Sequence, residues 1–521
     1  MPSQIIKDLV ESPHPIHKRY CSYWNFLLSS YEGGVDYTNA VIQKGSSVSF
    51  WDSVVKVFAN GQEIGNPQVS GNLFKHKKER SEDFSSRIEQ SYYYNFCAPV
   101  IDIYTNHLFK QPIIEDFLNI EKFLEYRKEN IDEMGSSINE FRKEMASVAQ
   151  LYGHCFVVVD MPQDRNEITF EDRILNNKFP YFNIYHPQNV INWALDEKGM
   201  PYWVLLAESK DSGVDYSTVK KDRKESVQYR LWTRDKWEVY DGEYNMISTG
   251  IHSVGLVPIV CVFNKQSKKA KSFLGISEIA DISFIARDIY NACSELKQIL
   301  RDQTFAFLAV QGKSSDYNEA VIGENKGLVY PEGANVPQYV SPPSSNADVY
   351  FQYIDRQVHK IFQMAKLEGG TGEFQGQSAV QQSGVSKAWD FNQTNSALSQ
   401  KAGNLNDAEE KIWTMFALWE GQNKFEGSIK YPDEFSIQSV NEDLDEAEKM
   451  ARLNLGKETD FAVKETIIKK KFPRASEEEI DAMVESMKSV VPEKAQPNRL
   501  AERLGLFKTG IPKGRGELNG N

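Results

Sequence analysis

The chain has 521 residues, a formal net charge of −13, and hydrophobic and aromatic fractions of 40% and 12%. So many aromatic side chains exclude an intrinsically disordered protein, and roughly one domain per ~150 residues allows three or four compact units. Tight binding of duplex DNA needs a basic surface, because cations release counterions from the phosphates. The acidic balance therefore favours a protein that passes nucleic acid along over one that holds it, although acidity serves solubility equally well.

The cysteines and the apolar segments indicate where the chain is kept. Five widely spaced cysteines without a CxxC pair favour a reducing compartment and argue against a disulfide framework. The first ten residues carry charge and lack an apolar core, so we expect no signal peptide. No run approaches the ~18 apolar residues of a membrane span. We expect a protein of the cytosol, or of a particle assembled there.

The first half of the chain reads as helices followed by strands. A helical pattern runs from Ser81 to Phe109 and stops at Pro112, and an amphipathic helix is predicted over 131–152 with Gly153 as its C-cap. Short apolar runs bounded by turn residues then predict an antiparallel sheet over about 153–263, with the helices packed on it. The predicted strands cover 155–159, 181–185, 190–195, 202–207, 227–232, 238–240 and 255–263.

Two long helices with heptad spacing follow, separated by an insert. The first, of ~25 residues and ~37 Å, and the second, over 347–367, each carry apolar residues at alternating three- and four-residue steps. The insert contains two apolar β runs, 304–310 and 327–330. The seam residues are Ile279, Ile282, Ala286, Ile289, Cys293, Leu296 and Leu300 in the first helix, and Phe351, Ile354, Val358, Ile361 and Ala365 in the second.

The last third begins with a polar loop. Residues 369–384 contain five glycines and four glutamines, which predicts a mobile loop, and a long helix follows over 385–420. A strand-like segment near 426–437 precedes charged helices over about 441–455 and 459–471, and a third that starts at the capping box of Ser476. Residues 490–521 are rich in proline and glycine and are not expected to form a packed core.

Catalytic motifs are missing. Gly312-Lys313-Ser314 is similar to the end of a Walker A motif, but Phe307 stands where that motif requires glycine, so a polar loop is the better interpretation. His14 and His17 have HxxH spacing without an HExxH motif, and no GxSxG elbow is found. Asp281 and Asp288 lie on what reads as a solvated helix face. We therefore expect no enzyme, no metal and no cofactor, and a structural or conduit protein instead.

The order of these parts resembles the portal proteins, or head-to-tail connectors, of tailed bacteriophages over roughly residues 80–420. The resemblance is carried by residues 91–112, the helix-to-strand stretch 146–161, and Gly255-Leu-Val-Pro258 followed by 273–277. The succession of helix, β insert, helix, Gly/Gln loop and long helix completes it. It implies an α+β portal fold, with a mainly helical stem and crown, an α/β wing with an antiparallel sheet, and a small β-containing clip.

The resemblance assigns a part of that fold to each segment. Residues 1–275 become the N-terminal part of the wing, 276–302 and 346–368 the two stem helices, 303–345 the clip, 369–384 the tunnel loop, 385–437 the long wing and crown helix with its return strand, and 438–521 the crown and C-terminal tail.

The resemblance also implies partners and site residues. Portal proteins form rings, typically of twelve subunits, at one capsid vertex of the virion after assembly in the host cytoplasm. Double-stranded DNA passes through the ring during packaging and ejection, without contact to a membrane. The clip binds the terminase large subunit and later head-completion, adaptor and tail proteins, while the major capsid and scaffolding proteins surround the ring.

Three groups of residues follow from these roles. The clip would dock partners through Lys313, Tyr317, Glu324 and Tyr330. Stem packing would rest on Ile279, Ile282, Ile289, Leu296, Ile354, Val358 and Ile361, with a second face at Phe284, Ile285, Ile299, Val349 and Phe362 that a monomeric core would use equally well. The channel would be lined by Gly372, Phe374, Gln375, Gln377, Gln381 and Gln382, with Lys366 and Lys387 beside the loop for transient phosphate contacts.

Two alternatives remain open. One is another virion structural protein, such as a minor capsid protein or an adaptor, but adaptors are usually much shorter and capsid proteins are not expected to carry paired stem helices. The other is a metal-dependent nucleic-acid enzyme that uses scattered Asp and Glu side chains. The absence of a paired-carboxylate motif counts against the enzyme.

Overall fold

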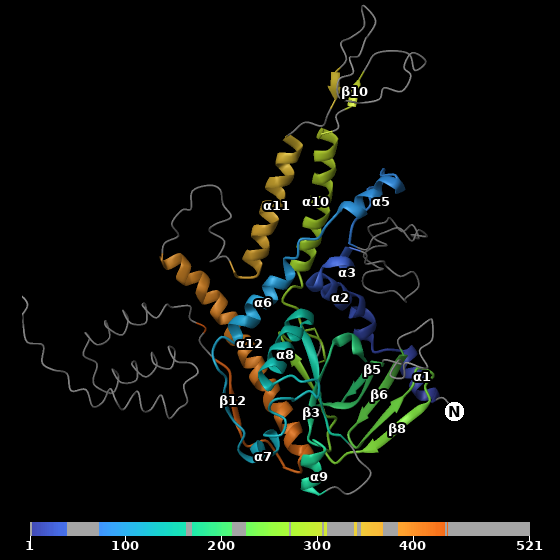
Figure 1. Cartoon of the computed structure of the whole chain (residues 1–521), viewed down its shortest axis with the longest axis vertical. Coiled ribbons are helices and arrows are strands. Elements are labelled where there is room, and N and C mark those ends of the chain that lie inside the picture. The colour runs from blue at the N-terminus through green and yellow to red at the C-terminus, as the bar shows by residue number, and fades with distance from the viewer. Residues whose placement is uncertain are drawn as a thin grey trace, which may run out of the picture. The chain divides into compact units, whose positions relative to one another are not determined.

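The structure, a computed structural model, describes residues 3–38, 72–162, 169–210, 226–269, 272–304, 307–309, 338–340, 345–367, 384–432 and 435. All of them belong to one compact unit, Met1–Phe435, and the second unit, Ser436–Asn521, lies outside them. The described part combines helices with antiparallel sheets, so the predicted α+β class is confirmed (Figure 1). The charged helices expected after residue 438 lie outside the described residues.

Short polar caps set where the N-terminal helices begin. The side chain of Ser3 accepts the N–H of Ile6 at the start of α1, and the Nδ1 of His14 accepts the N–H of Ile16 at the start of α2. Pro15 occupies the first turn of α2, where its missing N–H costs nothing. The first three helices are α1 (Gln4–Glu11), α2 (Pro15–Glu32) and α3 (Gly34–Thr38).

The helical run predicted over 81–109 is two helices, so the prediction was wrong between them. α5 (Ser81–Gln90) ends before residues 91–96, and α6 (Cys97–Leu108) starts afresh. Asn95 causes the restart, because its Oδ1 accepts the N–H groups of Cys97 at 3.1 Å and Ala98 at 3.0 Å. Tyr93, inside the break, stacks on Tyr37 with the ring centroids 3.7 Å apart.

The amphipathic helix expected from residue 131 is α8 (Ile138–Tyr152), which starts later because Ser137 and Glu140 form a capping box. Its predicted C-cap at Gly153 is confirmed, since this residue has a left-handed φ of 91°. A Cβ at Gly153 would lie 2.5 Å from the backbone of Gly275, and one at Gly275 would meet Gly153 even more closely. Both positions therefore require glycine, and the end of α8 touches the segment that leads into α10.

Each predicted strand is present, although the last one begins later than expected, at Ile259. The strand Met246–Ile251 was not predicted, and the strands form two sheets where one was expected. The three-stranded sheet has the order β3-β2-β9, the five-stranded sheet has the order β4-β5-β6-β7-β8, and all neighbours are antiparallel. The strands are β2 (His154–Asp160), β3 (Tyr181–Tyr185), β4 (Val190–Leu195), β5 (Pro201–Lys210), β6 (Ser226–Thr233), β7 (Lys236–Tyr240), β8 (Met246–Ile251) and β9 (Ile259–Phe263).

Strand β2 explains the division, because every one of its residues is buried and both of its faces are covered. Phe156 and Val158 join a core cluster with Trp193 and Trp232 of the five-stranded sheet. Val157 and its alternate neighbours belong to the main core cluster, which α8 and α12 also enter. The period of two therefore places the three-stranded sheet between the other sheet and the helices.

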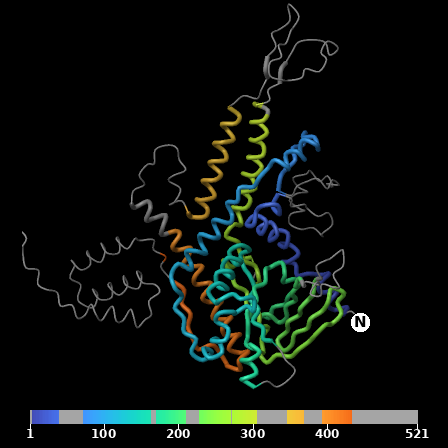
Figure 2. The backbone as a smooth tube through the Cα atoms, in the orientation of Figure 1, coloured from blue at the N-terminus to red at the C-terminus, as the bar shows by residue number. Residues whose placement is uncertain are grey.

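The chain then leaves this body through one helix and returns through another, side by side (Figures 1 and 2). They are α10 (Ile282–Thr304) and α11 (Ser345–Met364), and between them β10 (Phe307–Ala309) pairs antiparallel with β11 (Gln338–Val340). The long helix α12 (Gly384–Trp419) re-enters the body, and β12 (Ser428–Lys430) pairs with β1 (Ile114–Asp116). The short elements are η1 (Leu118–Ile120), α7 (Glu121–Leu124), α9 (Phe170–Leu175) and η2 (Pro187–Asn189). Of the helices in these ranges, none has both the length and the apolar composition of a membrane span.

Candidate functional site

The most distinctive feature of the described chain is the pair of helices α10 and α11, which projects from the body. At 23 residues, α10 is ~35 Å long. The structure buries Ile279, just before α10, and the seam residues Ile282, Ile289, Leu296 and Ile361, while Ile354 and Val358 are half-buried. The heptad spacing thus falls on residues that pack where the pair meets the body.

Seam positions farther from the body are open. Leu300 is 41% exposed and Phe351 is 49% exposed in the single chain. The proposed second face is divided as well. Phe284 packs within the body against Phe26, with ring centroids 5.4 Å apart, whereas Val349 on α11 is 65% exposed.

Tyrosine–carboxylate hydrogen bonds join the two helices along one side. The hydroxyl of Tyr353 donates to Asp288 Oδ2 at 2.5 Å, and Gln357 Nε2 donates to the same oxygen at 2.9 Å. One heptad farther along α10, the hydroxyl of Tyr350 donates to Glu295 Oε2 at 2.8 Å. These bonds raise the pKa of Tyr353 and, with burial as a lesser cause, raise the pKa of Tyr350 to about 12.

The sequence suggested that Asp288 only lines a solvated helix face. In the structure, Asp288 also joins α10 to α11 through hydrogen bonds. The signal that could have revealed this is the seven-residue spacing of Asp288 and Glu295, which keeps both carboxylates on one face of α10. Tyr350, Tyr353 and Gln357 repeat at three- and four-residue steps on α11 and match it.

A buried ion pair holds the start of α10 to the middle of α12. Lys401 Nζ lies 2.5 Å from Glu278 Oε2 and also donates to Asn264 Oδ1. Burial alone would raise the pKa of Glu278, but the charge and the hydrogen bond of Lys401 bring it below its usual value. Burial lowers the pKa of Lys401, and the charges of Lys366 and Lys265 lower it further. Glu278 is thus influenced by the charges of Lys401 and Lys366, and Lys401 by those of Lys366 and Lys265.

The end of α11 is fixed at the same place. The hydroxyl of Tyr104, on α6, donates to the carbonyl oxygen of Ala365 at 2.8 Å. The hydroxyl of Thr394, on α12, donates to the carbonyl oxygen of Lys366 at 2.5 Å. The segment before α10 and the residues just after α11 are therefore both attached to α12 or α6. Sequence patterns alone did not predict this junction, because its donors and acceptors are far apart along the chain.

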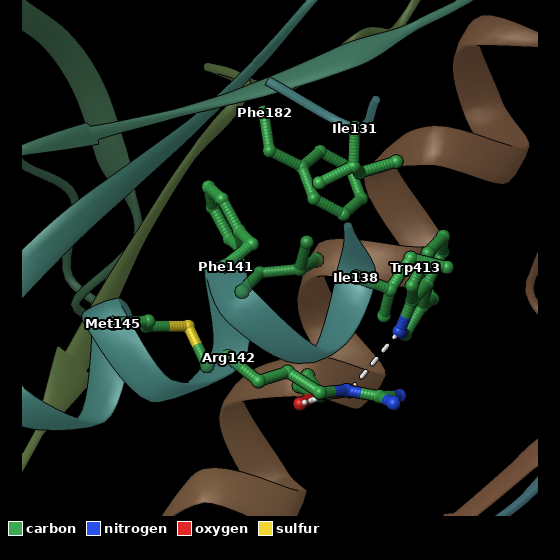
Figure 3. Close-up of a pocket in the computed structure, with 9 residues that line it drawn as sticks. Ile131, Ile138, Phe141, Arg142, Met145, Phe182 and Trp413 are labelled. Carbon is green, nitrogen blue, oxygen red and sulfur yellow. Dashed lines mark hydrogen bonds and ion pairs between the residues drawn. The ribbon is translucent and has the colours of Figure 1, made fainter. Parts of the chain in front are cut away.

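A second buried charge network lies deep in the body, beside a small apolar pocket (Figure 3). Arg142 Nε lies 2.9 Å from Glu409 Oε1, and Arg142 Nη1 lies 2.6 Å from Glu115 Oε2. Trp413 Nε1 and the hydroxyl of Tyr431 also donate to Glu409. The pocket's cavity of about 10 Å³ has room for no more than one water molecule. The contacts of this network join α8, β1, α12 and the residues around β12, so its role is structural.

The two histidines of the HxxH pattern, His14 and His17, contact an aromatic ring and a backbone carbonyl oxygen. The ring of His14 stacks on Trp193 at 3.8 Å, and His17 Nε2 lies 3.0 Å from the carbonyl oxygen of Gln188. Nowhere in the described ranges do three His, Cys, Asp or Glu side chains gather as a metal site would require.

Two of the predicted residue groups cannot be placed. The channel residues Gly372, Phe374, Gln375, Gln377, Gln381 and Gln382 and the docking residues Lys313, Tyr317, Glu324 and Tyr330 lie outside the described residues. Lys387 falls in α12, but its side chain is outside them as well. These assignments remain predictions.

Comparisons with known proteins add likenesses of low similarity. No family model matches the sequence, and no curated protein matches it. Among solved structures, the chain is similar to one described as "Neck of empty GTA particle computed with C6 symmetry", with a TM-score of 0.40 and 10% identity over 69% of this chain and 86% of that chain. A "Virion of native gene transfer agent (GTA) particle" structure gives 0.38 and 10% over 69% and 85%. A "Neck of native GTA particle computed with C12 symmetry" structure gives 0.37 and 10% over 74% and 89%. At these values the likenesses carry no conclusion about family or function.

Proposed function

We propose that this chain is a portal-type virion protein whose copies form a closed ring around passing double-stranded DNA. The observation that carries the proposal is the projecting pair α10 and α11, clamped at its base by α12 and α6 and joined beyond by the paired strands β10 and β11. A helix pair that carries a small β module away from an α+β body suits a stem that ends in a docking module.

Exposed apolar side chains on α11 support assembly into a ring. Val349, Phe351 and Met364 are 65%, 49% and 43% exposed, although all three are large and apolar. Phe351 lies on the seam face of the helix, and Val349 lies on the opposite face. A projecting helix with such side chains is expected to be covered by a partner, and a neighbouring copy in a ring supplies one without any new surface.

The ring would act as a conduit and not as an enzyme. An acidic chain repels phosphate, so DNA would slide past it while a separate motor supplies the force. Under this proposal the segment 303–345 docks the terminase large subunit and then the adaptor and tail proteins. The 369–384 loop lines the narrowest part of the channel, and major capsid and scaffolding proteins contact the outside of the ring at the capsid vertex.

Imaging of the purified full chain tests this proposal. We expect mass photometry to give one large species and negative-stain microscopy to give closed rings with a central hole. Val349→Glu should shift the population to smaller species, because it places a charge on the apolar surface between neighbours. A wild-type chain that remains a monomer or dimer at all concentrations would refute the ring.

Leu175→Glu is the matched control, because Leu175 on α9 is also a strongly exposed apolar side chain, at 82%. It should leave the rings intact. Both variants should keep the far-UV circular dichroism spectrum of the wild type, since neither side chain packs in the single chain. Loss of rings in both variants would show that α11 has no special part in assembly.

A further inference from the structure

One lysine, one asparagine and one glutamate meet where the end of β9, the segment before α10 and the middle of α12 come together. Lys401 Nζ lies 2.5 Å from Asn264 Oδ1 and 2.5 Å from Glu278 Oε2. Asn264 Nδ2 lies 3.2 Å from the same Glu278 oxygen. Lys401 and Asn264 are each only 7% exposed, and the Lys401 ammonium group lies over the ring of Tyr104. An amine and a side-chain amide are therefore held together beside a carboxylate, with little access to water.

Backbone hydrogen bonds hold the amide and the carboxylate in place. The N–H of Asn264 donates to the carbonyl oxygen of Gly153, and its own carbonyl oxygen accepts from Asn404 Nδ2 at 2.7 Å. The N–H of Glu278 donates to the carbonyl oxygen of Gln150 at 2.9 Å. The lysine belongs to the continuous helix α12. Groups fixed in this way react at a high effective concentration, because little freedom of motion remains to be lost.

The amine is within reach of the amide carbon. A carbonyl bond is about 1.23 Å long, so a nitrogen 2.5 Å from Asn264 Oδ1 lies at most about 3.7 Å from Asn264 Cγ. Reacting atoms in a near-attack arrangement are about 3–3.5 Å apart. The amide is also oriented, because its Nδ2 donates to the carbonyl oxygen of Ile276 at 3.1 Å and to Glu278. A small movement of the amine therefore brings it to the carbon.

We propose that Lys401 and Asn264 become joined by an intramolecular isopeptide bond, with Glu278 as the acid–base group. A proton moves from the ammonium group to Glu278 Oε2 along the existing hydrogen bond, and the neutral Nζ attacks Asn264 Cγ. Glu278 gives this proton to the departing Nδ2 and takes a second one from Nζ as the new amide forms. The Nζ–Cγ bond thus replaces the Cγ–Nδ2 bond. Both protons leave with the former Nδ2 as an ammonium ion, so the balance needs no other reactant.

The surroundings favour the neutral amine that the attack requires. Burial lowers the pKa of Lys401, and the charges of Lys366 and Lys265 lower it further, while Glu278 acts in the opposite direction. One oxygen of Glu278 contacts both the attacking and the departing nitrogen, which is the position that a proton shuttle needs.

The bond closes the part of the chain that carries the helix pair. Asn264 precedes α10 and Lys401 follows α11, so the link joins the two ends of this excursion at its base (Figure 1). A force that pulls on the helix pair then acts on a covalent bond as well as on hydrogen bonds. This covalent property belongs to the single chain and goes beyond the proposed ring.

Mass spectrometry of the purified full chain tests the bond. The intact mass should be about 17 Da below the mass of the sequence, because one ammonia is lost. A tryptic digest should contain a branched peptide in which the side chain of Asn264 is joined to an uncleaved Lys401. The full sequence mass without a branched peptide would refute the bond. So would the same loss of mass on a linear peptide, because it would identify a succinimide at Asn264.

Two substitutions test the roles of the lysine and the glutamate. Lys401→Arg keeps a cation beside Glu278, but its guanidinium does not lose a proton, so no ammonia should be lost. Glu278→Gln keeps the size of the side chain and should slow formation of the branched peptide roughly a hundredfold or more. Formation at the wild-type rate in Glu278→Gln would refute the proton shuttle.

Lys236→Arg is the matched control, because Lys236 also pairs with a carboxylate, that of Glu238 at 2.8 Å. It should form the branched peptide as the wild type does, and loss of the peptide in this variant would refute the assignment to Lys401. The outcome is independent of assembly. Rings without the bond would refute the bond and leave the portal proposal standing, whereas a monomer that contains it would support the bond and refute the ring.

Discussion

Carboxylates with several donors occur in two regions of this molecule, and the two regions differ in their exposure to water. In the body, Glu409 is 3% exposed and takes hydrogen bonds from Arg142, Trp413 and Tyr431. On the helix pair, Asp288 takes bonds from Tyr353 and Gln357, and Tyr353 is 41% exposed. Similar bonds should therefore contribute very differently to the free energy of unfolding. The contribution is large where losing the bond leaves a buried charge unpaired, and small where water can replace the partner.

The largest effect is expected at Arg142. Arg142→Met should lower the free energy of unfolding by about 3–5 kcal/mol, because it leaves Glu409 buried without its cation. Chemical denaturation followed by far-UV circular dichroism measures this as a shift of the midpoint.

The double variant Arg142→Met, Glu409→Leu is the control for the buried charge. It should recover most of the lost stability, because an apolar pair needs no compensating charge. A double variant as unstable as the single one would show that packing around the pocket, and not the unpaired carboxylate, carries the effect.

Acid should weaken the body through His154. This residue is fully buried among aromatic rings, its Nδ1 accepts the N–H of Gly275 at 3.3 Å, and burial lowers its pKa from 6.5 to about 3. Its pKa is depressed on folding, so its contribution is complete above pH 6.5 and is lost as the pH falls from 6.5 towards 3. Between about pH 7.5 and pH 5 the loss is about 2 kcal/mol.

The variant His154→Phe isolates this contribution, because it keeps an aromatic ring and removes the titration. The free energy of unfolding should fall less steeply between these pH values than in the wild type, by about the same 2 kcal/mol. Parallel pH profiles for the two proteins would mean that folding does not lower the pKa of His154.

Local patterns in the sequence identified most elements of the fold. Most strands, the glycine cap at Gly153 and the heptad helices follow from neighbours within a few residues, and the structure contains them. The break at Asn95 was missed because its cap lies inside an otherwise helical pattern. The division into two sheets was missed because apolar periodicity says that β2 is buried, but not which sheet covers each face.

The candidate site was harder to predict for the same reason. Spacing alone placed Ile282 and Ile289 on one helix face. Lys401 and Glu278 are separated by more than a hundred residues, and nothing near either one marks the pair. The left-handed backbone conformation of Lys366 was not predicted either, because lysine, unlike glycine, does not indicate that conformation.

The smallest effect is expected at the tyrosine–carboxylate bonds of the helix pair. A double-mutant cycle of Tyr353→Phe and Asp288→Asn, measured by thermal denaturation, should give a coupling of about 0.5 kcal/mol, because water replaces the lost partner at this exposed position. Measured again in Val349→Glu, which should not form rings, the coupling should stay the same if these bonds face water in the assembly. A coupling above about 2 kcal/mol in the wild type alone would contradict the contrast between the two regions, because it would mean that a neighbouring subunit covers the bonds and gives the helix pair the dry environment of the body.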